Sequence, residues 1–390
     1  MRYNFDEIVD RTGTDCFKYD YRKEYFGTED VIPMWVADMD FKTPDFILEA
    51  IRKRTEHEIL GYTIRSDTFF NTIIKWYKKR QQWEIEKEWI VYTPGVVPAL
   101  YLAVKAFSEE KKKVIIQPPV YHPFFSVIRS NQRRILENPL MLVDGRYYFD
   151  FEDLKNKLTP EVKVLLLCHP HNPVGRAWER KELIELAEIC LKNNIIILSD
   201  EIHSDLVLPG FKHEPVASLS EEIANITVTC IAPSKTFNLA GLSTAVVVIS
   251  NPELRKRFSF EVENSHLWIG NIFGKIALES AYSEGEDWLT QLLDYIRGNF
   301  NMLTDYLNTH IPDIKLIQPE ATYLAWLDMR NLGLGKKELS EFMIKKARIG
   351  CNDGQTFGSG GEGFQRMNIA CPKQILIQAL DQLKDAVHQL

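Results

Sequence analysis

The sequence predicts an α/β fold in which a mostly parallel β-sheet is covered by helices on both faces. The first observation is a set of short runs in which apolar residues follow one another without alternation, which is typical of strands buried on both sides. The second is that amphipathic helical patterns lie between these runs, and this alternation favours parallel strands. The predicted strands are residues 113–117, 162–168, 194–200, 225–232 and 244–250.

Before the first of these strands, a glycine turn opens a predicted helix within residues 93–107. The first backbone N–H groups of a helix have no partner within it and lie at the positive end of the helix dipole. Gly95, Val96 and Val97 could therefore present N–H groups to an anion such as phosphate. Pro98 fits the first turn because it lacks an N–H. An ordinary helix start is the alternative interpretation of this pattern.

A second helix is predicted over residues 180–193, where Leu183, Leu186, Ile189 and Cys190 share one apolar face. It lies between the strands predicted at 162–168 and 194–200. This strand–helix–strand order is what a parallel pair of strands requires.

The pattern changes after about residue 285, where one long amphipathic helix is predicted. A short strand, a further helix, a glycine-rich loop and a final helix follow it. We interpret this part as a smaller α+β domain, which the N-terminal arm joins because chain termini often lie close together. The predicted division is a large domain over residues 46–284 and a small domain made of residues 1–45 and 285–390.

Composition and charge exclude several classes of function. The chain has 390 residues, of which 45% are hydrophobic and 26% charged, as in ordinary globular proteins. A formal net charge of −7 argues against nucleic acid as the main partner, because phosphate backbones are bound by basic surfaces. The N-terminus is polar and acidic, unlike a signal peptide, and no apolar run approaches the ~18 residues of a membrane span. We therefore expect neither nucleic acid nor a membrane as partner.

The cysteines indicate a reducing compartment. The chain has 6 cysteines and no C-x-x-C pair, and Cys168, Cys190 and Cys230 lie in apolar segments where a reduced core thiol is expected. We therefore predict a cytoplasmic protein. Cys168 is close to His169 and His171, but no second cluster supplies zinc ligands at the usual spacing, so no metal site is predicted.

Polar residues follow four of the predicted strands. In open α/β sheets, ligands bind beyond the carboxyl ends of the strands, so side chains that follow neighbouring strands converge on one crevice. The residues in question are Tyr121, Asn172, Asp200, His203, Ser234 and Lys235.

Each of these residues also has a structural interpretation. Asp200 could cap a helix, and Asn172 before a proline could form a turn. His203 taken by itself is as well explained by structure as by function. Lys235 follows an apolar strand, although an isolated ammonium is costly to bury, so it either reaches the surface or is kept inside for chemistry.

Three motifs, in their order and spacing, resemble those of fold-type I pyridoxal-phosphate enzymes. They are HPHNPVG at 169–175, SDEIH at 199–203 and APSKTFNLAG at 232–241. Further stretches resemble the branch of the class I/II aminotransferase superfamily that contains cystathionine β-lyases of the MalY/PatB type. These stretches are VIPMWVADMDF (31–41), LGYT (60–63), PPVYHPF (118–124), ATYLAWLD (321–328) and RMNIACP (366–372).

The resemblance implies a fold, a cofactor and an assembly. The fold is that of fold-type I enzymes, with a mostly parallel seven-stranded sheet in the large domain and a smaller α+β domain. The cofactor is pyridoxal 5'-phosphate, and the substrate is a small molecule of the amino-acid class. Tyr62 resembles a tyrosine that reaches the cofactor phosphate from the partner subunit, which implies a homodimer with shared active sites.

The resemblance also implies a role for each site residue around the cofactor. Lys235 is the catalytic residue that bonds to the cofactor aldehyde, and desolvation favours the neutral amine that this bond needs. Asp200 pairs with the pyridine nitrogen and Tyr121 stacks on the ring. Asn172 and His203 hydrogen-bond the phenolate oxygen of the ring, where many aminotransferases have tyrosine in place of His203.

The phosphate and the substrate have predicted partners of their own. The backbone amides of Gly95, Val96 and Val97 and the hydroxyl of Ser234 bind the phosphate in the enzymes that the chain resembles. Arg366 holds the substrate carboxylate with both arms of its guanidinium. The other residues predicted to border the substrate are Tyr323, Ala37 and Asn172.

One departure from the pattern bears on the reaction. Many aminotransferases carry a phosphate-binding arginine eight residues after the lysine, where this chain has Ser243. This difference agrees with the lyase branch, so we expect a carbon–sulfur β-lyase that acts on cystathionine or related cysteine conjugates. An aminotransferase is the first alternative, and a cofactor-binding regulatory protein with little turnover is the second.

Overall fold

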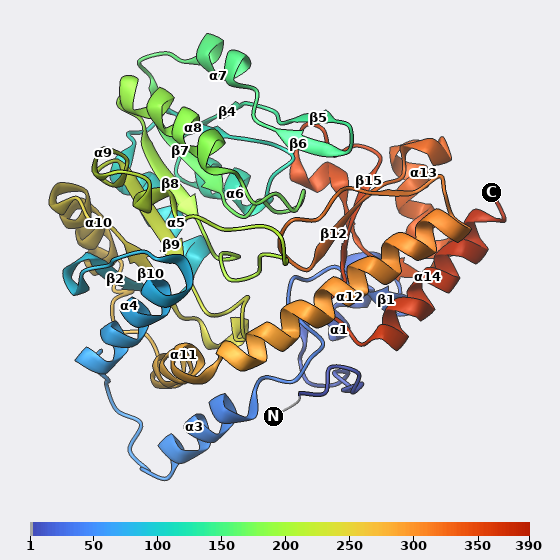
Figure 1. Ribbon diagram of the computed structural model, residues 1–390, viewed down its shortest axis with the longest axis horizontal. Helices are drawn as coiled ribbons and strands as arrows, with labels where there is room; N and C mark the ends of the chain where they lie inside the picture. Colours follow the sequence, from blue (N-terminus) through green and yellow to red (C-terminus); the bar gives the residue numbers. More distant parts are fainter. Residues whose placement is uncertain (1–2) are drawn as a thin grey trace.

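The centre of the structure is a seven-stranded sheet, seen in a computed structural model that describes residues 3–390 (Figure 1). The strands lie in the order β2-β10-β9-β8-β7-β3-β4. Their bounds are β2 (Ile90–Thr93), β3 (Lys113–Ile116), β4 (Arg134–Glu137), β7 (Val162–Cys168), β8 (Ile196–Asp200), β9 (Thr227–Ile231) and β10 (Ala245–Val248).

The sheet is mostly parallel, as the sequence predicts. Each pair from β9 through β8, β7 and β3 to β4 is parallel, whereas β10 runs antiparallel to both of its neighbours, β9 and β2. The five predicted strands are present, but β2 and β4 were not among them. Both are four residues long, and no residue of the edge strand β4 is fully buried, so neither gives a long apolar run.

Alternate side chains of each central strand point to opposite faces of this sheet. In β7, Val164 and Leu166 pack in one hydrophobic cluster with residues of α5 (Val96–Phe107) and α10 (Pro252–Asn264). Leu165 and Leu167 pack in another cluster with α8 (Arg180–Lys192). Burial on both faces explains why the strands are continuously apolar.

A second, four-stranded antiparallel sheet lies in the C-terminal part of the chain. Its order is β11-β12-β15-β14, and the long helix α12 (Glu286–His310) lies beside α14 (Lys373–Val387) next to it (Figure 1). The N-terminal arm joins this part, because β1 (Ile32–Pro33) pairs in parallel with β13 (Ile349–Gly350). The domain limits at residues 46 and 285 stay a prediction. The other strands here are β11 (Lys315–Leu316), β12 (Leu324–Asp328), β14 (Asn352–Asp353) and β15 (Phe364–Asn368).

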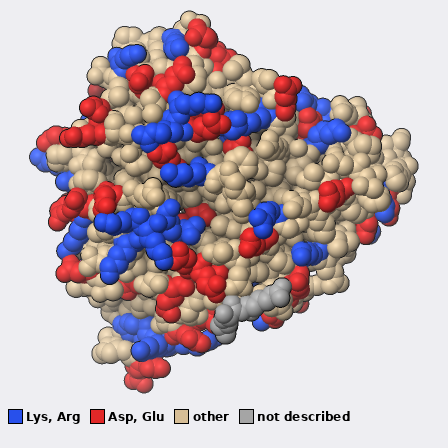
Figure 2. All heavy atoms as spheres, viewed as in Figure 1, with Lys and Arg blue, Asp and Glu red and all other residues tan. Residues whose placement is uncertain are grey.

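The remaining elements surround these two sheets. No described helix combines the length and the apolar character that a membrane span requires. On the face shown in Figure 2, lysine and arginine side chains are interspersed with aspartate and glutamate. The other elements are α1 (Phe17–Asp20), α2 (Arg22–Phe26), α3 (Asp45–Thr55), α4 (Asp67–Gln81), α6 (Pro123–Ser130), α7 (Phe151–Lys157), α9 (Glu221–Ala224), α11 (Ile272–Glu284), α13 (Lys336–Glu341) and the hairpin of β5 (Met141–Val143) and β6 (Arg146–Tyr148).

We expect Leu166→Ala to destabilise the protein by about 2–5 kcal/mol, because it leaves a cavity between β7 and the helices on its face. Leu166 is fully buried. Urea unfolding followed by circular dichroism measures the change. Ile377→Ala on the exposed side of α14 serves as control and should change the stability by less than about 0.5 kcal/mol. Equal effects of the two substitutions would contradict the packing described above.

Candidate functional site

A cavity of about 230 Å³ opens at the carboxyl ends of β7, β8 and β9, next to the N-terminus of α5. Cys168 and Asp200, the last residues of β7 and β8, are partners in register and both line the cavity. None of the described lining residues is an arginine. The lining consists of Ala37, Pro94, Gly95, Val96, Val97, Pro98, Tyr121, Cys168, Asn172, Asp200, Ile202, His203, Ser234, Lys235, Ala240, Ser243 and Thr244.

Most of the residues that the sequence singled out therefore lie around one cavity. Two more, Arg366 and Tyr323, lie directly behind its wall: Arg366 donates a hydrogen bond to Asn172 Oδ1 (3.0 Å) and Tyr323 donates one to the Ala37 carbonyl (2.8 Å). The one predicted residue outside this group is Tyr62, whose surface is 94% exposed. Its predicted role concerns a partner subunit, so a single chain does not test it.

Lys235 lies between β9 and the N-terminal arm, with its amine held by a backbone oxygen. Its Nζ donates a hydrogen bond to the carbonyl of Ala37 at 2.7 Å, and no described carboxylate forms an ion pair with it. Burial lowers the pKa of the Lys235 amine to about 8, although the negative charges of Asp38 and Asp200 act in the opposite direction. About a tenth of this amine is therefore neutral at pH 7, far more than of a lysine with the ordinary pKa of ~10.4, and the neutral form is the nucleophile.

Asp200 supplies a carboxylate at the base of the cavity. Burial raises the pKa of this carboxyl to about 7, and the backbone N–H of Ile202, which donates to Asp200 Oδ1 at 3.2 Å, offsets part of the effect. The carboxylate has no arginine or lysine within ion-pair distance among the described residues. It is therefore suited to pair with a cationic group that enters the cavity.

His203 and Tyr121 add polar and aromatic surface to the same cavity. The buried Nδ1 of His203 has no hydrogen-bond partner among the described residues. Burial lowers the pKa of His203 to about 3, so the ring is neutral near pH 7 and offers one donor and one acceptor. Burial raises the pKa of the Tyr121 phenol to about 12, which keeps this ring neutral as well.

The start of α5 provides donors of a different kind. Gly95 is the residue before the helix, and the amides of Val96 and Val97 lie in its first turn, where no intrahelical acceptor is available. Ser234, whose side chain carries a hydroxyl, lines the same cavity. Together these groups form a neutral donor set that fits an anion at a helix N-terminus.

Arg366 is a fully buried cation without a carboxylate partner among the described residues. Besides Asn172, its guanidinium donates to the carbonyl of Trp35 (2.8 Å) and to Asn352 Oδ1 (2.6 Å), while its Nε has no partner. Burial lowers the pKa of this guanidinium to about 10, so it keeps its charge at neutral pH. An unpaired buried cation is costly, and a carboxylate ligand would remove that cost.

The sequence did not indicate how closely residues 35–39 are tied to this site. Trp35 and Ala37 offer their carbonyls to Arg366 and Lys235, and Asn368 donates to the carbonyls on either side of Ala37. The stretch WVADM (35–39) is one of those that resemble the lyase branch, but within it the resemblance assigned a role only to Ala37. The contacts join residues that lie between 198 and 332 positions apart, which local patterns do not reveal.

The residues of the cavity fit pyridoxal phosphate. An amine with a lowered pKa, an unpaired buried carboxylate and a helix N-terminus match the aldehyde, the pyridine nitrogen and the phosphate of that cofactor, respectively. The unpartnered Nδ1 of His203 leaves a polar atom for the ring oxygen. The observed donor set therefore agrees with the cofactor that the resemblance implies.

Comparisons with known proteins agree with this geometry. The model of the family "Aminotransferase class I and II" matches residues 29–383. Cystathionine beta-lyase PatB of Bacillus subtilis is 45% identical over 385 residues, which cover 98% of this chain and 100% of that protein.

Two solved structures are similar along the whole chain. Cystalysin from Treponema denticola, which contains a pyridoxal 5'-phosphate cofactor, superposes with a TM-score of 0.97 at 38% identity and 100% coverage of both chains. The pyridoxal-phosphate-bound C–S lyase from Staphylococcus hominis superposes with a TM-score of 0.92 at 34% identity, covering 99% of this chain and 98% of that one. The predicted fold-type I architecture is thereby confirmed.

We expect the amine of Lys235 to react with cyanate in the cofactor-free protein with a pH midpoint near 8. Exposed lysines should continue to gain reactivity towards their ordinary pKa of ~10.4. Mass spectrometry of peptides from protein labelled between pH 6 and 10 measures both rates in one sample. A midpoint of Lys235 that coincides with that of the exposed lysines would contradict the effect of burial.

Proposed function

The chain belongs to the aminotransferase class I and II family, and we propose that it is a pyridoxal-phosphate-dependent carbon–sulfur β-lyase. It cleaves cystathionine or a related cysteine S-conjugate by α,β-elimination, and with one water the products are a thiol, pyruvate and ammonia. The observation that carries the proposal is that two buried basic side chains occur at one site. Lys235 has a lowered pKa, and Arg366 has no carboxylate partner among the described residues.

Three side chains account for binding of the cofactor ring. Lys235 would hold the cofactor through its aldehyde carbon, for which the lowered pKa of the amine is suited. Asp200 holds the proton on the pyridine nitrogen, and the positive charge there lowers the pKa of its carboxyl, which burial otherwise raises. Tyr121 stacks on the ring face.

Substrate binding depends on the buried cation behind the cavity wall. Arg366 donates two hydrogen bonds to the α-carboxylate of the amino acid, and its unpartnered Nε is available for one of them. Asn172 already holds one arm of the guanidinium and so fixes its plane. Tyr323 and the backbone at Ala37 border the amino acid on the other side.

Bond cleavage then requires a base and an electron sink. When bound, the cofactor supplies a ring that accepts the electron pair left at the substrate Cα. The amine of Lys235, which lies at the cavity, would take the Cα proton as general base. The electron pair forms a double bond between Cα and Cβ, and the bond from Cβ to sulfur breaks, so that the sulfur leaves as a thiolate. Hydrolysis of the resulting enamine gives pyruvate and ammonia.

The same residues could in principle move the proton elsewhere and so perform transamination. Two observations favour elimination. Two of the relatives that match along the full chain carry the names cystathionine beta-lyase and C–S lyase. The position of the arginine that many aminotransferases use for the phosphate is Ser243, and this residue lines the cavity.

We propose further that the active protein is a cytoplasmic homodimer. Tyr62 lies in an exposed loop with three further apolar side chains that are largely exposed, Ile59, Leu60 and Ile64. An exposed apolar group of this kind is typical of a surface that is covered by a partner. In the dimer, Tyr62 reaches the cofactor phosphate of the other subunit.

The cytoplasmic location rests on the cysteines, all six of which are free.

The proposed reaction predicts that the purified protein releases pyruvate and free thiol from cystathionine without any keto acid. Lys235→Ala should lower this rate by at least about 1,000-fold, because it removes both the covalent link and the base. Lactate dehydrogenase and a thiol reagent measure the two products. Borohydride reduction should fix vitamin B6 at residue 235 only in the wild-type protein. No pyruvate from any cysteine S-conjugate, together with keto-acid-dependent amino exchange, would instead identify an aminotransferase.

The proposed dimer predicts complementation between two defective chains. Tyr62→Ala and Lys235→Ala should each have low activity alone. In co-expressed mixtures, half of the dimers are mixed and contain one complete site each, so about a quarter of wild-type activity returns. The control mixture pairs Tyr62→Ala with the double variant Lys235→Ala/Tyr62→Ala, which keeps the same share of Lys235 sites but supplies no Tyr62 from either subunit. Failure of the first mixture to exceed this control would refute a role for Tyr62 across the interface.

A further inference from the structure

Residues 35–39 form an irregular segment that faces the cavity with its carbonyl groups. The carbonyls of Trp35 and Ala37 accept hydrogen bonds from Arg366 and Lys235, at 2.8 Å and 2.7 Å. No strand of the described sheets includes this segment, and backbone hydrogen bonds anchor the chain only at its two flanks, Met34 and Asp40. Between these flanks, side chains from other parts of the chain bind the segment.

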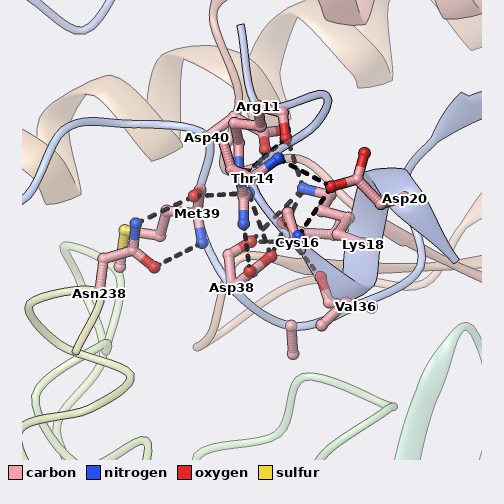
Figure 3. Close-up of polar contacts among 12 residues, drawn as sticks. Arg11, Thr14, Cys16, Lys18, Asp20, Val36, Asp38, Met39, Asp40 and Asn238 are labelled. Carbon is pink, nitrogen blue, oxygen red and sulfur yellow. Dashed lines mark hydrogen bonds and ion pairs between the residues drawn. The ribbon is translucent and has the colours of Figure 1, made fainter. Parts of the chain in front are cut away.

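On the opposite side, two cations of the N-terminal arm bind the acidic side chains of this segment and its flank (Figure 3). Lys18 Nζ lies 2.8 Å from Asp40 Oδ2 and 3.9 Å from Asp38 Oδ1. Arg11 lies 2.6 Å from each of the same two carboxylates. The four charges balance and form one cluster, which we call the arm clamp.

The clamp contacts the backbone as well as the side chains. Lys18 donates to the Asp38 carbonyl at 3.5 Å, and Arg11 donates to the Met39 carbonyl at 3.2 Å. The side chain of Lys18 has 0% exposed surface, which is rare for a lysine. The chain thus buries a second lysine within a few residues of the site, in this case fully paired.

Stability alone does not explain such a cluster. A buried ion pair is often no more stable than apolar residues of the same shape, because desolvation offsets the attraction. What the pair supplies is direction: each carboxylate is held from two sides by Lys18 and Arg11. By fixing these carboxylates, the clamp also fixes where the carbonyls of Trp35 and Ala37 lie on the other side of the segment.

We propose that Lys18 and Arg11 are positioning residues for substrate binding, which act through residues 35–39 on Arg366. The clamp sets the position of the Trp35 carbonyl, and this carbonyl orients the guanidinium that receives the substrate carboxylate. The inference rests on the proposed function, since it assigns that carboxylate to Arg366.

Two asparagines provide alternative anchors for the same segment. Asn238 accepts from the N–H of Met39 and donates to its carbonyl, and Asn368 donates to the carbonyls of Val36 and Asp38. If these amides alone fixed the segment, removal of the clamp would have no effect on substrate affinity. The experiment must therefore separate the clamp from the asparagines and from a general loss of stability.

The test compares Lys18→Met with the control Lys42→Met. Lys42 forms an exposed ion pair with Glu7 in the same part of the chain and touches neither the cavity nor the clamp. In Lys18→Met we expect KM for the amino-acid substrate to rise about 10-fold while kcat changes by less than about 3-fold. Cofactor absorbance should stay as in the wild-type protein, because Lys235 and Asp200 are intact.

A second readout needs neither cofactor nor turnover. In the cofactor-free protein, hydrogen exchange of peptides that cover residues 35–41 should be faster in Lys18→Met than in Lys42→Met. Peptides from β7 and β8 should exchange as in the wild type. Should Lys18→Met fail to fold, Arg11→Gln serves in its place, since Arg11 is partly exposed and binds the same carboxylates.

The outcomes distinguish this inference from the proposed function. If the wild-type protein releases no pyruvate, the proposed function is wrong, and amino-acid titration of the cofactor absorbance then measures substrate affinity in place of KM. Unchanged affinity and unchanged exchange of residues 35–41 would overturn the role of the clamp. Faster exchange throughout the protein would assign Lys18 to general stability and would overturn it as well.

Discussion

The structure depends on the burial of one ammonium group, that of Lys235, without a carboxylate beside it. Desolvation of a cation is expensive, so the surrounding chain must supply a partner that does not restore the full charge. The partner is the carbonyl of Ala37, which contributes a partial rather than a full negative charge. For this contact to form, the N-terminal segment has to close over the carboxyl edge of the sheet. The architecture of the site therefore follows from where this segment is held.

The same burial acts on the other ionisable groups in opposite directions. It raises the pKa of Asp200 to about 7 and lowers that of Arg366 to about 10, because each charged form loses water. Neither group has found an opposite charge within ion-pair distance among the described residues. A zwitterionic amino acid on a cofactor with a cationic ring nitrogen and an anionic phosphate supplies the missing charges: the carboxylate meets Arg366, and the ring nitrogen meets Asp200. The charges of Asp200 and Arg366 are thus matched by the ligands and not by other side chains of the site.

The sequence predicted those features that depend on local patterns. Continuous apolar runs located five strands, and the rule that parallel strands share a carboxyl edge placed Asn172, Asp200 and Lys235 around one cavity. The direction of β10 was not predictable in this way, because strand direction depends on how connections cross the sheet and not on composition. Strand β4 was missed since an edge strand has no need of a fully apolar run. The contact between Arg366 and the Trp35 carbonyl joins residues 331 positions apart, and no local sequence pattern predicts a contact at that separation.

An irregular segment is better suited to this task than a strand. In a strand, each carbonyl pairs with a neighbouring N–H, and none would remain for Lys235 or Arg366. Residues 35–39 leave carbonyls free for side chains from β15 and from the lysine loop, so two separate parts of the chain converge on one short backbone. The disadvantage is that such a segment has no position of its own. Paired charges on its outer side can restore that position and leave the Trp35 and Ala37 carbonyls free, because they act through the side chains of Asp38 and Asp40 and through the carbonyls of Asp38 and Met39.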